Sequence, residues 1–195
     1  MIAADDVKKL RDITSASMMD CKRALEEAGG DAEKAVELLR KKSLIKAEKK
    51  SERETKQGIV EVYVHSNRRL GAMAEILCET DFVARNEIFK QLAHDLVMHI
   101  AAMNPLYINE NAIPPEVIES ERRIFQAQVD GSFDKPAHVI KEIIEGKLKK
   151  HFQDICLMSQ PFIKNPDITV EELIKEHIAK LGENIKIGRF ARFEL

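Results

Sequence analysis

The chain of 195 residues contains no tryptophan and only three cysteines, and aromatic residues make up 5% of it. Aromatic platforms on which nucleic-acid bases could stack are therefore scarce. The cysteines, Cys21, Cys78 and Cys156, are isolated and form no C-x-x-C pair. Their odd number and their spacing argue against a disulfide framework and a zinc site, and suit a reducing cytosol.

Long apolar runs and an excess of one charge are also absent. No run reaches the roughly 18 residues that span a bilayer, and the N-terminus lacks the apolar stretch of a signal peptide. We therefore expect a cytoplasmic protein that is not exported and has no membrane partner. The net charge of -2 excludes a globally basic nucleic-acid-binding protein, so a nucleic-acid partner is not expected.

Motifs for covalent or nucleotide chemistry are missing. There is no G-x-G-x-x-G, no phosphate-binding loop that ends in lysine and serine or threonine, and no G-x-S-x-G. The six histidines show no metal-ligand spacing, and Cys78, which lies on a Val-rich hairpin, is interpreted as a small core residue. We predict no enzyme, no cofactor and no metal site.

The first 55 residues have helical patterns. The first helix carries apolar residues at helical spacing: Val7, Leu10 and Ile13. A second helix, 17–28, has Ser17 as N-cap and stops at Gly29-Gly30, and Asp31 caps a third helix. Three short helices in so few residues predict a compact bundle.

The charged stretch 40–56 follows, with eight Lys or Arg and three Glu. It contains no glycine or proline, so it is interpreted as a helical spacer with a solvated face. The alternative is an RNA-binding arm. The interspersed glutamates and the lack of aromatic residues make that alternative weaker.

At Gly58 the apolar period changes from 3.6 to 2. Segments 58–65 and 69–78, joined by a turn at 66–68, predict a β-hairpin. The final segment alternates and predicts a third strand added to it, with these residues on one face: Ile185, Ile187, Ala191 and Phe193.

Further helices lie between these strands. An apolar stripe from Phe89 to Ala101 predicts a long helix. Two charged helices, from Pro115 to about Val129 and from Pro136 to about Leu157, joined by a turn at 130–135, predict a projecting antiparallel hairpin.

The expected fold is therefore α+β: a three-helix bundle, then a three-stranded antiparallel sheet with helices and the projecting helical hairpin. The expected domains are 1–55, the bundle with its spacer, and 56–195, the core with the hairpin inserted at about 114–157.

The segment ETDFVARN places Phe82 beside Asp81 where a strand gives way to a helix. Periodicity favours Phe82 as a hydrophobic staple folded onto its own helix. The alternative is an exposed aromatic wedge that anchors a protein interface. Met18-Met19 raises the same choice in the bundle, between core filler and an adaptable contact.

Five segments resemble bacterial elongation factor Ts, in order and over essentially the whole chain. They are LRDITSASMMDCKRALEEAGGDAEKAVELLRKK, ILCETDFVARNEIF, NPLYI, SQPFIKNPDITVEELI and LGENIKIGRFARFEL. The resemblance implies a guanine nucleotide exchange factor that binds elongation factor Tu, releases its GDP and so supports polypeptide elongation. It also implies that the bundle is similar to a ubiquitin-associated domain.

The resemblance implies these binding residues as well. In the bundle, the positions that dock on the GTPase are Arg11, Met18 and Met19. The turn that wedges between helices of the GTPase and disturbs its magnesium site is Thr80, Asp81, Phe82 and Val83. Further contact positions are His65, Leu181 and Gly182.

The sequence departs from the family pattern in several places. Leu77 stands where Asn is common, and Ser66-Asn67-Arg68-Arg69 replaces a more Gly-rich turn. The chain has one core hairpin unit where longer relatives have two, which raises the hypothesis of a homodimer. The alternative function is an RNA-associated translation or folding accessory protein that uses stretch 40–56.

Overall fold

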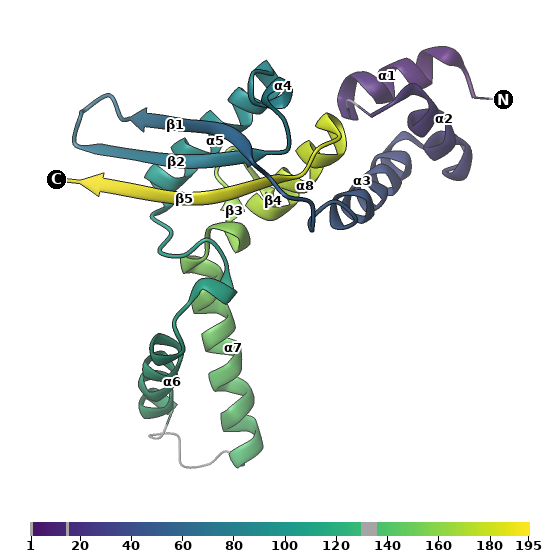
Figure 1. Ribbon diagram of the computed structural model, residues 1–195. Coiled ribbons are helices and arrows are strands. Elements are labelled where there is room, and N and C mark those ends of the chain that lie inside the picture. The colour runs from purple at the N-terminus through teal and green to yellow at the C-terminus, as the bar shows by residue number, and fades with distance from the viewer. Residues whose placement is uncertain (1, 15, 130–135) are drawn as a thin grey trace. The chain divides into compact units, whose positions relative to one another are not determined.

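The computed structural model describes residues 2–14, 16–129 and 136–195 (Figure 1). The α-helices are α1 (Ala4–Thr14), α2 (Met18–Glu27), α3 (Ala32–Glu48), α4 (Asp81–Ala84), α5 (Glu87–Met103), α6 (Pro115–Val129), α7 (Ala137–Ile155) and α8 (Val170–Leu181). The strands are β1 (Gln57–Val64), β2 (Leu70–Cys78), β3 (Pro161–Phe162), β4 (Asn165–Thr169) and β5 (Ile185–Glu194). Short 3-10 helices are η1 (Glu110–Ala112) and η2 (Leu157–Ser159). This mixture of helices and strands confirms the predicted α+β class.

The described residues fall into two compact units. One unit is drawn from Met1–Glu61, Glu75–His94 and Glu172–Gly188. The other is drawn from Val62–Ala74, Asp95–Glu171 and Arg189–Leu195. The division of the chain into domains 1–55 and 56–195 stays a prediction.

The three N-terminal helices share one apolar core, as their spacing predicts. Its buried residues are Val7, Leu10, Cys21, Ala24, Leu25, Ala35 and Leu39. Ser17 Oγ accepts the Asp20 N–H at 3.1 Å, and Asp31 Oδ1 accepts the Lys34 N–H at 3.1 Å, so both N-cap predictions are confirmed. The assignment of Ile13 to the apolar stripe is wrong, because its side chain is 74% exposed.

The helical spacer is shorter than predicted. Helix α3 ends at Glu48, and residues 49–56 form turns and an irregular segment. The carbonyls of Ser51 and Arg53 accept hydrogen bonds from Asn184 Nδ2, at 3.1 and 2.8 Å. A side chain distant in the sequence thus satisfies these two carbonyls, which in a longer helix would accept backbone N–H groups. The spacing of apolar residues gives no sign of such a distant partner.

The sheet has strand order β1-β2-β5, so the hairpin and the third strand are confirmed. Gly58 has φ of 155°, and a Cβ there would collide with the carbonyl oxygen of Ile76, so glycine is required where β1 approaches β2. One face of β2 is buried through Ala72, Ala74, Ile76 and Cys78. On β1 the Val-bearing face is open, because these side chains are exposed: Val60, Val62 and Val64.

The predicted face of β5 is not buried along its whole length. Ile185 is buried, whereas Phe193 is 71% exposed. The neighbouring Arg192 faces the other way, where its Nε donates to the carbonyl of Ala101 at 2.8 Å. Ile185 and Phe193 therefore do not share one buried face.

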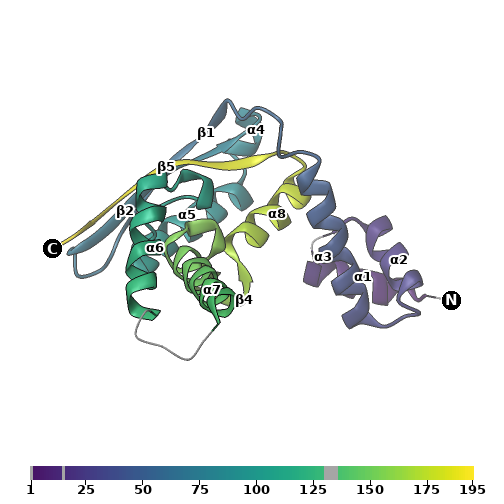
Figure 2. The ribbon, with the colours of Figure 1, turned by 90° about the horizontal axis from the view of Figure 1, so that it is seen from below.

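The helical hairpin is confirmed by α6 and α7, which lie side by side and run in opposite directions (Figures 1 and 2). Their core contains Ile113, Val129, Ile144, Leu148, Phe152 and Cys156. The predicted turn at 130–135 lies outside the described residues. The second helix was predicted to end at about Leu157. In the structure α7 ends at Ile155, and Leu157 is the first residue of the 3-10 helix η2.

The two-stranded sheet of β3 and β4 was not predicted from the sequence, and it is tied to α5 through His99. The His99 side chain is fully buried. Its Nδ1 accepts the Ile163 N–H at 3.2 Å, and its Nε2 lies 3.0 Å from Gln160 Oε1. Gln160 Nε2 in turn donates to the carbonyl of Asp154 at 2.6 Å. A neutral ring with its proton on Nε2 satisfies every one of these atoms.

Burial lowers the pKa of His99 from its ordinary value of 6.5, and only the Gln160 hydrogen bond opposes this. The unfolded chain therefore binds a proton at a pH at which the folded chain does not. The contribution of neutral His99 to stability is complete above about pH 6.5 and is lost as the pH falls below that value.

We therefore expect urea unfolding to give a lower free energy of unfolding at pH 5.5 than at pH 7.5. The variant His99→Gln should be less stable at pH 7.5 but should show a smaller loss between the two pH values. An equal loss in both proteins would contradict the assignment of this acid sensitivity to His99.

Candidate protein-binding site

The turn Thr80–Val83 joins β2 to α5 and opens the one-turn helix α4. Backbone hydrogen bonds close it, from the Ala84 N–H to the Thr80 carbonyl at 3.2 Å and from the Asn86 N–H to the Val83 carbonyl at 2.9 Å. Ala84 is buried, and Val83 is half-buried. The turn thus has one side fixed to the protein and one side open.

Phe82 stands on the open side with 84% of its surface exposed. The staple interpretation is therefore wrong, because a staple residue would cover its side chain with its own helix. An exposed phenylalanine on a short, closed turn offers a large apolar contact area to a partner. Beside it, Asp81 forms an ion pair with Arg85 at 3.0 Å on an exposed surface, an interaction worth at most about 1 kcal/mol. Asp81 can therefore exchange this partner for another at little cost.

Two side chains fix the ends of the turn. Asn86 Oδ1 accepts the Ile88 N–H at 2.8 Å, so Asn86 caps the start of α5. Beneath the turn, Cys78 Sγ donates to the Thr80 carbonyl at 3.2 Å. Burial, with the charge of Glu183 adding to it, raises the pKa of Cys78 to about 11. The thiol therefore stays protonated at neutral pH, which agrees with a core residue and not with a nucleophile.

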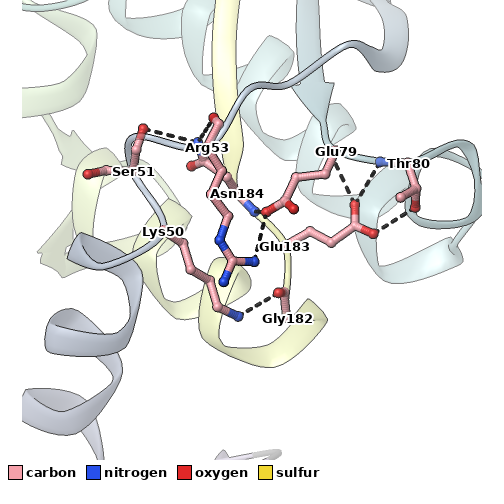
Figure 3. A network of polar contacts seen from close by, with 8 residues as sticks. All are labelled: Lys50, Ser51, Arg53, Glu79, Thr80, Gly182, Glu183 and Asn184. Carbon is pink, nitrogen blue, oxygen red and sulfur yellow. Dashed lines mark hydrogen bonds and ion pairs between the residues drawn. The ribbon is translucent and has the colours of Figure 1, made fainter.

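Glu183 is the residue of this site that the sequence did not indicate. Its carboxylate binds Thr80 through both the backbone N–H and the hydroxyl (Figure 3). Gly182, a predicted contact residue, directly precedes Glu183 in the chain, so these hydrogen bonds also bring Gly182 near the turn. Gly182 is exposed and has φ of 83°, and Leu181 is half-buried. Glu183 lies in the segment LGENIKIG, but nothing in that segment indicates a hydrogen-bond partner more than 100 residues earlier in the chain.

The other predicted contact residues are exposed on their own elements. Arg11 is exposed on α1, and Met18 and Met19 on α2 are 43% and 58% exposed. These methionines are therefore not core filler. His65 is exposed at the end of β1, where its Nδ1 lies 2.9 Å from the hydroxyl of Tyr63. Among the described hydrogen bonds, none joins these residues to the turn.

The basic stretch 40–56 pairs several of its charges with acidic side chains. Lys42 Nζ lies 2.7 Å from Glu27 Oε1, and Lys56 Nζ lies 2.6 Å from Glu54 Oε2. Arg53 lies 3.5 Å from Glu79. These pairs lower the positive potential that an RNA backbone would meet, so they favour the solvated spacer over the RNA-binding arm.

The part of the chain that the structure describes shows neither a group of metal-ligating side chains nor a membrane-spanning helix. Within residues 2–14, 16–129 and 136–195, no group of three or more His, Cys, Asp or Glu side chains is placed to hold a metal ion. The helices in those ranges include none with the length and hydropathy needed to cross a bilayer.

Comparison with known proteins identifies the whole chain. The family model described as elongation factor TS matches residues 2–195. Elongation factor Ts of Carboxydothermus hydrogenoformans is 55% identical over 195 residues, which cover 100% of this chain and 89% of that protein. The protein of the same name from Thermotoga petrophila is 52% identical over 194 residues, 100% of this chain and 96% of the relative. Elongation factor Ts of Thermosipho melanesiensis is 53% identical over 193 residues, which cover 99% of this chain and 98% of that protein.

These matches extend over the same segments from which the resemblance was first inferred, and they leave no part of the chain from residue 2 onward unassigned. The chain therefore belongs to the elongation factor Ts family of translation elongation factors.

Proposed function

We propose that this protein is a guanine nucleotide exchange factor that binds elongation factor Tu and promotes release of its GDP. The observation that carries the proposal is the exposure of Phe82, 84%, on a turn whose backbone is closed by hydrogen bonds. An exposed aromatic side chain on a turn with a fixed backbone is what an interface anchor requires. A translation factor acts where ribosomes work, so the proposed place of action is the cytoplasm.

The mechanism needs no covalent step. An exchange factor accelerates GDP release by binding the nucleotide-free GTPase more tightly than the GDP-bound form. By linkage, GDP and the exchange factor must weaken each other's binding equally. In this proposal Phe82 wedges between helices of the GTPase, and Asp81 brings a negative charge close to the magnesium site of that partner. Thr80 and Val83 complete the contact.

The proposed docking surface of the N-terminal bundle consists of Arg11, Met18 and Met19. Their exposure supports this role, because flexible methionine side chains adapt to a partner surface. The bundle with its spacer, 1–55, would act as one binding domain and the core, 56–195, as the other. His65, Leu181 and Gly182 are proposed as further contacts, supported by the exposure of His65 and Gly182.

We also propose that the protein forms a homodimer through the open face of its sheet. The exposed apolar residues there surround a hollow of about 390 Å³, whose lining includes Val62, Val64, Met73, Phe193 and Leu195. Strands β1 and β5 are both edges of the sheet, and a second copy would cover such edges and the exposed valines together.

The proposed exchange function is tested by release of fluorescent GDP from the cognate elongation factor Tu. With this protein at a tenth of the GTPase concentration, we expect release to be accelerated for the whole GTPase population, because each exchange factor molecule acts repeatedly. No acceleration by the folded protein would overturn the proposal.

A further inference from the structure

The carboxylate of Glu183 accepts three hydrogen bonds from two consecutive residues (Figure 3). Its Oε2 accepts the N–H of Glu79 at 3.2 Å and the N–H of Thr80 at 2.9 Å. Its Oε1 accepts the hydroxyl proton of Thr80 at 2.6 Å. Hydrogen bonds to an ionised acceptor are roughly twice as strong as neutral ones, so this is a firm attachment.

A second carboxylate binds in the opposite direction. Glu79 Oε1 accepts the backbone N–H of Asn184 at 2.6 Å. Each of the two chain segments, 79–80 and 183–184, therefore binds the backbone of the other through a glutamate. We call these four residues, Glu79, Thr80, Glu183 and Asn184, the carboxylate clasp.

The clasp also holds the spacer that leads to the N-terminal bundle. Asn184 is 1% exposed, and its side-chain amide donates to the carbonyls of Ser51 and Arg53. Lys50 Nζ donates to the carbonyl of Gly182, the residue before Glu183 (Figure 3). The turn and the spacer are thus fastened at one place in the structure.

The turn needs such an attachment, because α4 has only four residues and a single helical turn is unstable by itself. Thr80 is its N-cap residue, yet the Thr80 side chain forms no capping hydrogen bond within α4. The Thr80 hydroxyl is instead used by Glu183. Glu183 therefore fixes the backbone and the side chain of the residue from which α4 starts.

We propose that Glu183 is a positioning residue for nucleotide exchange: it holds the turn Thr80–Val83 in one orientation so that Phe82 meets the GTPase without a prior ordering step. This inference rests on the proposed exchange function. A contact segment whose backbone is already ordered loses less conformational entropy on binding. Glu183 acts through Phe82 and touches no nucleotide.

Two substitutions separate the geometry of Glu183 from its charge. In Glu183→Gln, the amide oxygen can accept both backbone N–H groups and the amide nitrogen can donate to the Thr80 hydroxyl, so three hydrogen bonds survive without the charge. In Glu183→Asp, the charge survives, but the side chain is one methylene too short to reach these groups.

We expect the GDP release rate to fall about tenfold in Glu183→Asp, equivalent to ~1.4 kcal/mol, and by less than about twofold in Glu183→Gln. The reverse order would overturn the proposal, because it would make the charge of Glu183, and not its geometry, the important property. Asp95→Asn is the control, since it removes an ion pair with Lys164 at 2.8 Å without altering the clasp. The Asp95→Asn protein should accelerate GDP release from elongation factor Tu as much as the parental protein does.

A double-mutant cycle tests whether Glu183 acts through Phe82. In a Phe82→Ala background, Glu183→Asp should change the release rate by clearly less than the tenfold expected with Phe82 present, since only the contacts of Thr80, Asp81 and Val83 are then left to be positioned. A further tenfold loss would overturn the inference, because Glu183 would then act independently of Phe82.

Amide hydrogen exchange tests the positioning without any GTPase. In Glu183→Asp the amides of Glu79 and Thr80 should exchange at least about tenfold faster than in the parent, and in Glu183→Gln they should stay protected. Unchanged protection in Glu183→Asp would overturn the inference. If the parental protein does not accelerate GDP release from elongation factor Tu, but the amides of Glu79 and Thr80 exchange faster in Glu183→Asp as expected, the proposed function fails while the positioning of the turn stands.

Discussion

Phe82→Ala should slow GDP release by elongation factor Tu at least about thirtyfold, at a given concentration of this protein, while its melting temperature changes by less than ~2 °C. A buried interface anchor contributes about 2 kcal/mol or more, which corresponds to roughly that factor. The free protein loses almost nothing, because Phe82 is 84% exposed and its removal opens no cavity.

Phe89 offers the matched comparison seven residues further on. It is 0% exposed on α5, so Phe89→Ala should lower the free energy of unfolding by roughly 3–5 kcal/mol through the lost packing and the cavity. The two variants together distinguish a binding residue from a core residue. A clear fall in the melting temperature of Phe82→Ala would contradict the expectation that Phe82 contributes little to stability, and a parental release rate would remove the wedge assignment.

The features that sequence predicted well are those decided within a few residues. Ser17 and Asp31 start helices because a side-chain oxygen takes an orphan N–H three residues later, and this bond is visible in the spacing alone. The alternation of β2 predicts its buried face for the same reason, since successive side chains of a strand point to opposite faces.

The features that sequence predicted poorly depend on distant partners. Ile13 fits a helical stripe, yet 74% of its surface is exposed, because the core of the bundle is completed by residues of α2 and α3. The helix of the spacer ends early, at Glu48, and the carbonyl of Arg53 beyond it accepts a hydrogen bond from Asn184, 131 residues further along the chain. Periodicity carries no information on such long-range hydrogen bonds.

The candidate site shows the same division. The resemblance pointed to the turn Thr80–Val83, but periodicity preferred a buried Phe82, since a staple and a wedge have the same local sequence. Only the tertiary structure shows that the aromatic ring is left open and that Glu183, 103 residues away, holds the backbone beneath it. The residue that orients the turn was therefore invisible to a local reading of ETDFVARN.

Val62→Glu should dissociate the proposed homodimer. The Val62 side chain is 52% exposed near the middle of β1, on the face proposed to meet a second copy. In a twofold interface each new charge appears twice and is taken out of water, at a cost of several kcal/mol. We expect the dissociation constant to rise at least about a hundredfold, measured by sedimentation equilibrium.

Ile124→Glu is the matched control for this variant. Ile124 is 48% exposed on α6, away from the proposed interface residues in sequence and on a different element, so the same type of substitution there should leave the dimer intact. A monomer mass for the parental protein at micromolar concentration would remove the homodimer proposal. An undiminished dimer in Val62→Glu would show instead that the two copies meet on another surface, and the open face of the sheet would then need a different partner to cover its valines.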